Sequence, residues 1–359
     1  MCSSDLRPMA HHGPVAIAMR QAHRIDGLGQ RADLGVIGAG SWGTALAVTL
    51  AAKGHQVKIW DLDKEHLRSL QESKENIRYL PGVSFPEKLV AVDTDREALE
   101  DADVALFSAP AQHFRAAFTS ALKYIPKDAV IVNVAKGIEK GSLKRMSEIA
   151  FEIKPDAKYV VLSGPSHAEE VGKRLPTTVA VGARDRQLAE YVQDIFITDK
   201  FRVYTSDDIT GMELGGSLKN IIALGAGISD GMGYGDNAKA ALMTRGLVEI
   251  KRLGMELGAD PNTLSGLAGI GDLIVTCTSM HSRNRRCGIM IGEGTPPAEA
   301  TEKIGMVVEG MATTEAAYDL SKKVGVEMPI THAIYQIIDD RSEERRVGKE
   351  SRSRWSPYH

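Results

Sequence analysis

The segment LGVIGAGSWG, residues 34–43, decides the fold through what stands on either side of it. Its first four residues favour a β-strand, and its last six form a G-x-G-x-x-G pattern that leads into the apolar, helix-favouring stretch Thr44–Ala52. Gly54 ends that stretch, and the β-favouring run Gln56–Trp60 follows and stops at Asp61. A strand, a glycine-rich turn, a helix, a second strand and an acidic residue in this order predict a βαβ unit of the Rossmann type.

Each glycine of the pattern has its own predicted task. Gly38 permits the tight turn, Gly40 lets the backbone approach a pyrophosphate, and Gly43 lets the helix pack closely on the strand. The helix that begins beside Ser41 and Trp42 directs unpaired N–H groups and the positive end of its dipole at that phosphate. We therefore expect these five residues to bind a dinucleotide. The alternative is a glycine-rich turn without a ligand.

Asp61 is predicted to distinguish the two nicotinamide dinucleotides. It stands near the usual spacing of about 20 residues after the glycine pattern, where a carboxylate accepts hydrogen bonds from the adenosine ribose hydroxyls. A carboxylate there also repels a 2′-phosphate, so either NAD or NADP is expected as cofactor, with NAD favoured. The alternative is that Asp61 caps the next helix, which is expected to begin near Lys64.

The rest of the chain reads as a β-rich part and then a helical part. Up to about Asp207, short β-favouring runs alternate with helix-like stretches, which indicates a mostly parallel, doubly wound sheet covered on both faces. Beyond it, long helices are predicted at Ile209–Ser229 and Asn237–Leu257, the second with Asp236 as N-cap and Gly258 as its stop. The predicted fold class is α/β: an N-terminal Rossmann-type sheet followed by an all-α C-terminal domain. Further strands are predicted at Val104–Ser108, Ala129–Val134, Tyr159–Leu162, Thr178–Val181 and Arg202–Tyr204, and further helices at Met311–Lys323 and Thr331–Ile338.

These patterns also set the predicted domain limits. Residues 1–31 show no sustained apolar period and are expected to form a disordered leader. Residues 32–206 are predicted to form the dinucleotide-binding domain, and residues 207–340 the helical domain for substrate and catalysis. Residues 341–359 are rich in Arg, Glu and Ser, bury too little apolar surface to fold, and are expected to form a disordered tail.

Composition narrows the function classes. The chain has 359 residues, 43% of them hydrophobic and 25% charged, which is typical of a globular protein with room for two domains. Its formal net charge of -3 argues against nucleic acid or an anionic membrane surface as a partner. Three cysteines are too few for a disulfide framework or a four-ligand zinc site, and no apolar run approaches the roughly 18 residues of a membrane span. We therefore expect a cytoplasmic protein that binds no metal ion. Self-association as a homodimer is possible but is not decided by the sequence.

Six segments, in order and at suitable separations, resemble the bacterial NAD(P)-dependent glycerol-3-phosphate dehydrogenases. The resemblance covers about residues 33–338, and the combination is specific although each piece alone is not. It implies reversible hydride transfer between NAD(P)H and dihydroxyacetone phosphate, which gives sn-glycerol 3-phosphate for phospholipid synthesis. The segments are GAGSWGTAL (38–46), AKG (135–137), SGPS (163–166), LGGSLKN (214–220), GIGDL (269–273) and SRNRR (282–286).

Such a reaction needs a positioned acid and base, for which Lys219 is the candidate. It stands mid-helix among apolar neighbours, where an ammonium is costly if it is only structural, and burial or a nearby cation can bring a lysine pKa towards neutrality. Lys136, at the end of a β-rich run, is expected to contact cofactor and substrate and to lower the pKa of Lys219. Asp272 is expected to orient Lys219 or to bond a substrate hydroxyl. The resemblance makes Lys219 the proton donor and acceptor; solvated lysines and a turn aspartate are the alternatives.

The substrate phosphate needs hydrogen-bond donors, which Ser282, Arg283 and Asn284 offer in succession. Arginine binds phosphate oxygens in a bidentate manner, so one such residue supplies affinity and orientation. The resemblance assigns all three residues to the substrate and lets Arg283 reach the cofactor as well. With Arg285 and Arg286 beside them, a nucleic-acid patch is the rival interpretation, although the cluster is short and has no interleaved aromatic residues.

Five more site residues follow mainly from the resemblance. Gly164 and Ser166 come just after a β-rich run and are expected to receive the substrate; the family often has Thr at the Ser166 position. Ala168 is small enough to lie against the cofactor. Val307 and Glu309 correspond to family positions that close over the dinucleotide.

Several alternatives remain beside the main hypothesis. Ketopantoate reductases and β-hydroxyacid dehydrogenases have a similar build but take carboxylate substrates, and a dinucleotide sensor would bind the cofactor without turnover. His113 and His167 are expected to be hydrogen-bonded, non-catalytic residues. The chain also leaves the family pattern near Asp339, so the closing helix of the family is expected to be missing, and the leader precedes the family's first strand.

Overall fold

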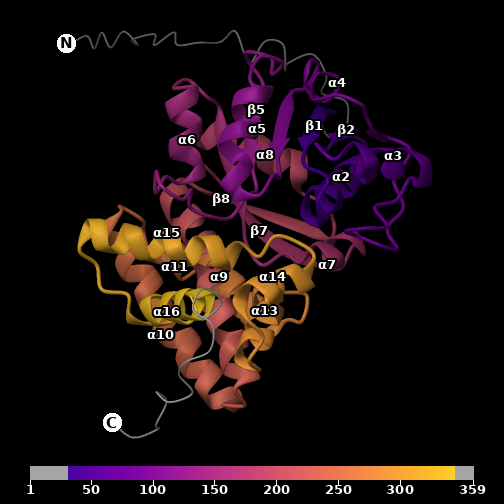
Figure 1. Cartoon of the computed structure of the whole chain (residues 1–359). Helices are drawn as coiled ribbons and strands as arrows, with labels where there is room; N and C mark the ends of the chain where they lie inside the picture. Colours follow the sequence, from indigo (N-terminus) through magenta and orange to yellow (C-terminus); the bar gives the residue numbers. More distant parts are fainter. Residues whose placement is uncertain (1–30, 344–359) are drawn as a thin grey trace, which may run out of the picture.

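The computed structural model describes residues 31–343, which form two layered parts (Figure 1). An eight-stranded sheet and its helices make up the sheet half, residues 33–206, and a bundle of helices makes up the helical half, residues 209–343. In Figure 1 the sheet half lies above the helical half. The predicted fold class is confirmed.

The sheet has the order β3-β2-β1-β4-β5-β6-β7-β8, so the chain winds outward from β1 in both directions. All neighbouring strands are parallel except β6 and β7, which are antiparallel. Strands β4 and β5 are buried at every position because helices cover both faces of the sheet. The strands are β1 Asp33–Ile37, β2 Gln56–Trp60, β3 Leu89–Ala91, β4 Val104–Phe107, β5 Val130–Asn133, β6 Tyr159–Ser163, β7 Thr177–Ala183 and β8 Phe201–Ser206.

Two separate apolar clusters, one on each face, hold the helices to the sheet. Side chains of α2, α3, α7 and α8 belong to one cluster, and side chains of α4, α5 and α6 belong to the other. Burial of this apolar surface on both faces is the main favourable contribution to the stability of such a sheet. The helices are α2 Ser41–Lys53, α3 Lys64–Ser73, α4 Asp95–Leu99, the 3-10 turn η1 Ala111–His113, α5 Phe114–Ala121, α6 Met146–Ile153, α7 Ala168–Gly172 and α8 Arg186–Phe196.

The helical half is built around α9, which is buried over most of its length. Helices α10, α12, α13 and α15 pack on it, and a short π-helical segment, η2, leads directly into α12. Contacts of α9 with β6 and β7 place one of its faces towards the sheet half. The elements are α9 Ile209–Gly231, α10 Gly235–Glu256, α11 Pro261–Leu264, η2 Leu267–Gly271, α12 Asp272–Thr278, α13 Arg283–Gly292, α14 Pro297–Ile304, α15 Glu309–Val324 and α16 Pro329–Glu343.

The long predicted elements are confirmed with shifts of a few residues at their ends, and one predicted cap is wrong. Asp236 is not the N-cap of α10, because the helix begins at Gly235, two residues before the predicted start at Asn237, and Tyr234 occupies the N-cap position. Gly235 has a positive φ of 77°. Asp236 lies in the first turn, where its carboxylate pairs with Lys239 at 3.2 Å. Gly258 does follow the helix end, with a φ of 84°. Strand β3 and helices α11 to α14 were not predicted.

The predicted ends of the chain fall largely outside the described residues. Apart from Arg31, the whole predicted leader lies there, as do residues 344–359. Helix α16 continues to Glu343, so the predicted tail begins inside a helix. The last strand ends at Ser206 and α9 begins at Ile209; the domain limits stay predictions.

One test on the helices concerns membranes. Across residues 31–343, no single helix combines the length and apolar character that crossing a bilayer requires. Two neighbouring segments taken together, Pro261–Thr278 and Arg283–Gly292, reach the length and apolar composition of a membrane span, but the chain bends by 49° between them.

Candidate active site

The glycine-rich turn between β1 and α2 has the geometry that the sequence predicts. Gly38 has a φ of +103°, and a Cβ there would lie 3.0 Å from the backbone of Ser108. A Cβ on Gly43 would lie 2.1 Å from the carbonyl oxygen of Gly38, so only glycine lets α2 pack this closely. At Gly40, by contrast, a Cβ would meet no atom within 4 Å. Open space at this glycine is what an approaching pyrophosphate requires.

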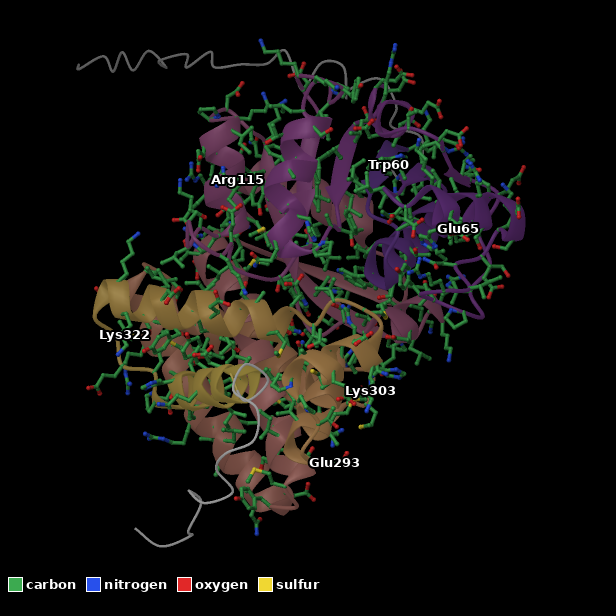
Figure 2. The ribbon with its side chains drawn as sticks, in the orientation of Figure 1. Trp60, Glu65, Arg115, Glu293, Lys303 and Lys322 are labelled. Atoms are coloured by element: carbon green, nitrogen blue, oxygen red, sulfur yellow. The ribbon has the colours of Figure 1, made fainter. Side chains whose placement is uncertain are left out.

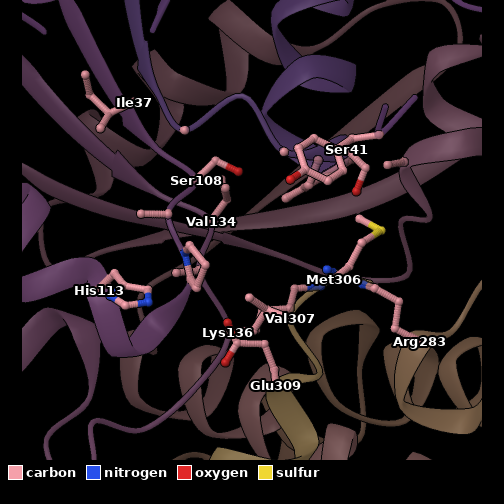
Figure 3. A pocket seen from close by; sticks show the side chains of 18 of the residues that line it. Ile37, Ser41, Ser108, His113, Val134, Lys136, Arg283, Met306, Val307 and Glu309 are labelled. Carbon is pink, nitrogen blue, oxygen red and sulfur yellow. The ribbon is translucent and has the colours of Figure 1, made fainter. Parts of the chain in front are cut away.

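A cavity of about 660 Å³ lies between the turn and the helical half (Figure 3). Figure 3 shows Ser41 of the sheet half across the cavity from Arg283 and Val307 of the helical half. Three predicted residues, Gly43, Gly164 and Asp272, do not line it. The predicted residues that do line it are Gly38, Gly40, Ser41, Trp42, Asp61, Lys136, Ser166, Ala168, Lys219, Ser282, Arg283, Asn284, Val307 and Glu309.

Three charged side chains meet at the base of this cavity. The carboxylate of Asp272, only 1% exposed, accepts from the ammonium of Lys136 at 2.7 Å and, through its other oxygen, from the ammonium of Lys219. Lys136 follows β5 in the sheet half, whereas Lys219 lies on α9 and Asp272 begins α12. The structure therefore brings together three predicted residues from distant segments.

Burial lowers the pKa of Lys219 to about 7. That pKa is the net result: the carboxylate of Asp272 opposes the effect of burial, and the ammonium of Lys136 adds to it. Burial raises the pKa of Asp272, but the two ammonium groups outweigh it, and the pKa lies below its usual value. A lysine that titrates near neutrality is suited to giving and taking protons, because both its states are populated at pH 7.

Thr276 completes this group, and the sequence prediction missed it. Its hydroxyl accepts from the ammonium of Lys219 at 2.8 Å and donates to the carbonyl oxygen of Asp272 at 2.6 Å. The signal was the spacing of four residues between Asp272 and Thr276, which places both on one face of a helix. Lys219 is thus held by two partners on α12.

Arg283 is the cation on the other side of the cavity. It begins α13 and lines the cavity, and within residues 31–343 its guanidinium has neither a hydrogen-bond nor an ion-pair partner. Burial lowers its pKa, and the carboxylates of Glu309 and Glu169 oppose that shift. An enclosed guanidinium without a protein partner is a candidate for binding an anionic ligand.

The two predicted neighbours of Arg283 have structural hydrogen bonds. The hydroxyl of Ser282 caps α13 by accepting from the amide N–H of Arg285 at 3.2 Å. The amide of Asn284 donates to Asn220 Oδ1 at 2.9 Å and accepts from the N–H of Gly310 at 2.8 Å. Asn284 therefore joins three helices, and Asn220 is a cavity residue that the sequence prediction missed.

Of the two arginines that follow in the basic cluster, Arg285 and Arg286, the first is held by protein partners. The guanidinium of Arg285 pairs with Asp230 at 2.8 Å and donates to the carbonyl oxygen of Thr278. One guanidinium nitrogen of Arg286, Nε, is buried without a partner in the described part of the chain. The rival interpretation, a nucleic-acid patch, requires an exposed basic surface, and neither the paired Arg285 nor the buried Nε of Arg286 provides one.

Asp61 lies at the rim of the cavity and supports the glycine-rich turn. Its carboxylate accepts from the amide N–H of Ala39 at 2.7 Å and from that of Asp63 at 3.0 Å. The proposed alternative, in which Asp61 caps the next helix, is wrong. Asp63 is the N-cap of α3 and accepts from the N–H groups of Glu65 and His66.

Two buried polar atoms at the cavity have no partner among the described residues, Trp42 Nε1 and Glu309 Oε2. The other oxygen of Glu309 accepts from the amide N–H of Ala111 at 3.0 Å, which links α15 to the sheet half. Val307, just before it, is 44% exposed at the cavity. A buried indole N–H without an acceptor is costly, so it fits a ligand that supplies one.

The turn after β6 completes the cavity wall. The carbonyl oxygen of Gly164 accepts from Lys136 at 3.1 Å and from the hydroxyl of Ser166 at 2.9 Å. Gly164 itself has a φ of +145°, and a Cβ there would lie 2.9 Å from the Cα of Val179. Ala168 is buried and starts α7. The turn thus positions Lys136 as well as lining the cavity.

A Rossmann sheet, a glycine-rich turn and a buried lysine of near-neutral pKa define an NAD(P)-dependent oxidoreductase of the two-domain type. Family models described as the N-terminus and the C-terminus of NAD-dependent glycerol-3-phosphate dehydrogenase match residues 33–189 and 208–348. The chain belongs to this family, as the resemblance implied.

Individual relatives agree with the family models. A glycerol-3-phosphate dehydrogenase [NAD(P)+] of Pelotomaculum thermopropionicum is 54% identical over 307 residues, which cover 84% of this chain and 88% of the relative. The crystal structure of glycerol-3-phosphate dehydrogenase from Coxiella burnetii superposes with a TM-score of 0.84 at 40% identity, covering 86% of this chain and 95% of that one. A ketopantoate reductase from Ralstonia eutropha, at 15% identity and a TM-score of 0.57, covering 87% of this chain and 99% of that one, shares the fold alone.

Proposed function

We propose that the chain reduces dihydroxyacetone phosphate to sn-glycerol 3-phosphate with a nicotinamide dinucleotide, and so supplies phospholipid synthesis. The observation that carries the proposal is the shared cavity, which has the glycine-rich turn on one side, Arg283 on another and Lys219 at its base. Oxidation of NADH or NADPH after addition of dihydroxyacetone phosphate, followed by absorbance, tests it. A chain that binds NADH but does not oxidise it would be the non-catalytic sensor.

We assign the chemical steps to the side chains at the base of the cavity. Lys219 places a proton on the carbonyl oxygen of the substrate as that oxygen gains negative charge, and takes the proton back in the reverse reaction. Asp272 and Thr276 hold the ammonium in place, and Arg283 binds the phosphate. The dinucleotide, when bound, supplies or accepts the hydride. Its pyrophosphate is assigned to the open space at Gly40, with the orphaned N–H of Trp42 as a further donor.

The pKa of Lys219 predicts opposite pH profiles for the two directions. Reduction needs the protonated lysine, so kcat/KM for dihydroxyacetone phosphate is expected to fall as the pH rises through about 7. Oxidation of sn-glycerol 3-phosphate needs the neutral lysine, so its kcat/KM is expected to rise through the same pH. Initial rates between about pH 5.5 and 9 test both.

Asp272→Asn serves as the matched control for these profiles. The substitution removes the carboxylate that raises the pKa of Lys219, so the pKa falls and both profiles should move to lower pH. Profiles that keep their midpoints in this variant would mean that another group titrates.

Asp61 supports a preference for NADH over NADPH. Asp61→Asn keeps an oxygen for the N–H of Ala39 but removes the charge that repels a 2′-phosphate. We expect the ratio of kcat/KM for NADH to that for NADPH to fall by roughly tenfold, which corresponds to about 1.4 kcal/mol. Asp199→Asn makes the same change at an acid that does not line the cavity and should leave the ratio unaltered. A ratio that Asp61→Asn does not change would remove Asp61 from cofactor selection.

Two further expectations belong to this function. A cytoplasmic location accords with the two buried cysteines, Cys277 and Cys287, which are both free thiols. Disulfide bonds are rare in reducing compartments such as the cytoplasm. Self-association as a homodimer stays a prediction, and sedimentation equilibrium measures it directly.

A further inference from the structure

His167 lies in the cavity wall, and one of its two ring nitrogens is hydrogen-bonded to the backbone. It lies between Ser166 and Ala168, lines the cavity and is partly buried. Its Nε2 lies 3.4 Å from the carbonyl oxygen of Val275 on α12. A carbonyl only accepts, so Nε2 carries the proton and Nδ1 of the neutral ring has a free lone pair. Among residues 31–343, Nδ1 has no hydrogen-bond partner.

The surroundings keep this ring neutral. Burial lowers the pKa of His167 and the ammonium of Lys219 lowers it further, against smaller opposing effects of the Val275 carbonyl, Glu169 and Asp272. The ring of His281 lies 5.6 Å away, centroid to centroid, on the exposed side. A neutral ring beside Lys219 is a hydrogen-bond acceptor, not a cation for phosphate.

The groups that contact Lys219 and Lys136 are already engaged in hydrogen bonds with them. The two lysines are donors, and the Asp272 carboxylate that pairs with both of them is 1% exposed and does not line the cavity. The hydroxyl of Ser166 donates to the carbonyl oxygen of Gly164. Dihydroxyacetone phosphate has one strong hydrogen-bond donor, the free hydroxyl beside its ketone. The sequence left open whether Asp272 binds this hydroxyl, and the burial of Asp272 behind the cavity wall favours the other role, which is to hold Lys219.

We propose that His167 is a specificity-determining residue whose Nδ1 accepts the hydrogen bond of the free hydroxyl of the substrate. This role presupposes the proposed function. Its consequence is discrimination against ketone phosphates that lack the hydroxyl, because such a ligand leaves a partly buried acceptor unpaired. The role involves no proton transfer by His167, so Lys219 remains the acid and base.

Two isosteric variants and one altered substrate test this role. His167→Gln keeps an N–H for the carbonyl of Val275 but has no acceptor at the Nδ1 position, whereas His167→Asn keeps an oxygen there. Hydroxyacetone phosphate has a methyl group in place of the hydroxymethyl group. We expect His167→Gln to lower kcat/KM for dihydroxyacetone phosphate by roughly tenfold and to leave hydroxyacetone phosphate nearly unaffected. His167→Asn should retain most of the selectivity.

The measured quantity is the ratio of the two kcat/KM values, which does not depend on the fraction of folded enzyme. An unchanged ratio in His167→Gln, whether both substrates lose activity equally or neither does, would overturn the assignment. His113→Gln makes the same change at another histidine of the cavity and should keep the ratio. If the unsubstituted chain turned over neither substrate, the proposed function itself would fail.

Discussion

Replacing Lys219 with methionine is expected to lower kcat for dihydroxyacetone phosphate by roughly 10²- to 10⁴-fold, the usual effect of losing a general acid. Methionine keeps the apolar stem of the side chain but has no proton to give. The carboxylate of Asp272 retains Lys136 as its partner at 2.7 Å, so it is not left as an unpaired buried charge. Stopped-flow or steady-state rates with saturating substrate and cofactor measure the effect.

The dissociation constant of NADH should change little in this variant, because Lys219 is held by Asp272 and Thr276 of α12 and lies outside the glycine-rich turn to which the dinucleotide is assigned. Lys303→Met makes the same change at an exposed lysine of α14, labelled in Figure 2, and should leave kcat unaltered. A Lys219→Met enzyme with ordinary kcat would remove this lysine from the mechanism.

Replacing Arg283 with alanine is expected to raise KM for dihydroxyacetone phosphate by roughly 100-fold, with a smaller effect on kcat. Among residues 31–343 the guanidinium has no hydrogen-bond or ion-pair partner, so its loss leaves the substrate phosphate without its charge-assisted donor. Saturation curves at fixed cofactor concentration measure KM. Competition by inorganic phosphate should weaken in the same variant, because both anions would use one site.

Arg285→Ala is the matched control for that experiment. Arg285 lies on the same helix but pairs with Asp230 and does not line the cavity, so its loss should lower thermal stability more than affinity. A substrate KM that rises equally in both variants would indicate a damaged helix, and an unchanged KM in Arg283→Ala would exclude the phosphate assignment.

Features fixed by local geometry could be predicted from the sequence. The G-x-G-x-x-G turn was placed correctly because its glycines are required by contacts within one βαβ unit: a Cβ on Gly43, for example, would lie only 2.1 Å from the carbonyl oxygen of Gly38. Strand β3 was missed because three residues are too few for a periodic signal. The cap at Asp236 was misplaced because glycine, with a positive φ, began the helix earlier than propensity suggests.

Features that depend on packing between distant segments could not be predicted. Lys136, Lys219 and Asp272 were each named from the sequence, but only the fold shows that one carboxylate serves both lysines. The bonds of Asn284 to Asn220 and Gly310 likewise exist only because three helices meet there. The spacing of residues along the chain does not indicate which distant segments come into contact.

The ion pair between Lys136 and Asp272 joins the sheet half to the helical half. Its carboxylate is 1% exposed, and parting the two halves at this point would leave it only Lys219, from its own half, as an ion-pair partner. The proton donor is therefore aligned in the resting enzyme, and little reorganisation energy is spent when the substrate enters.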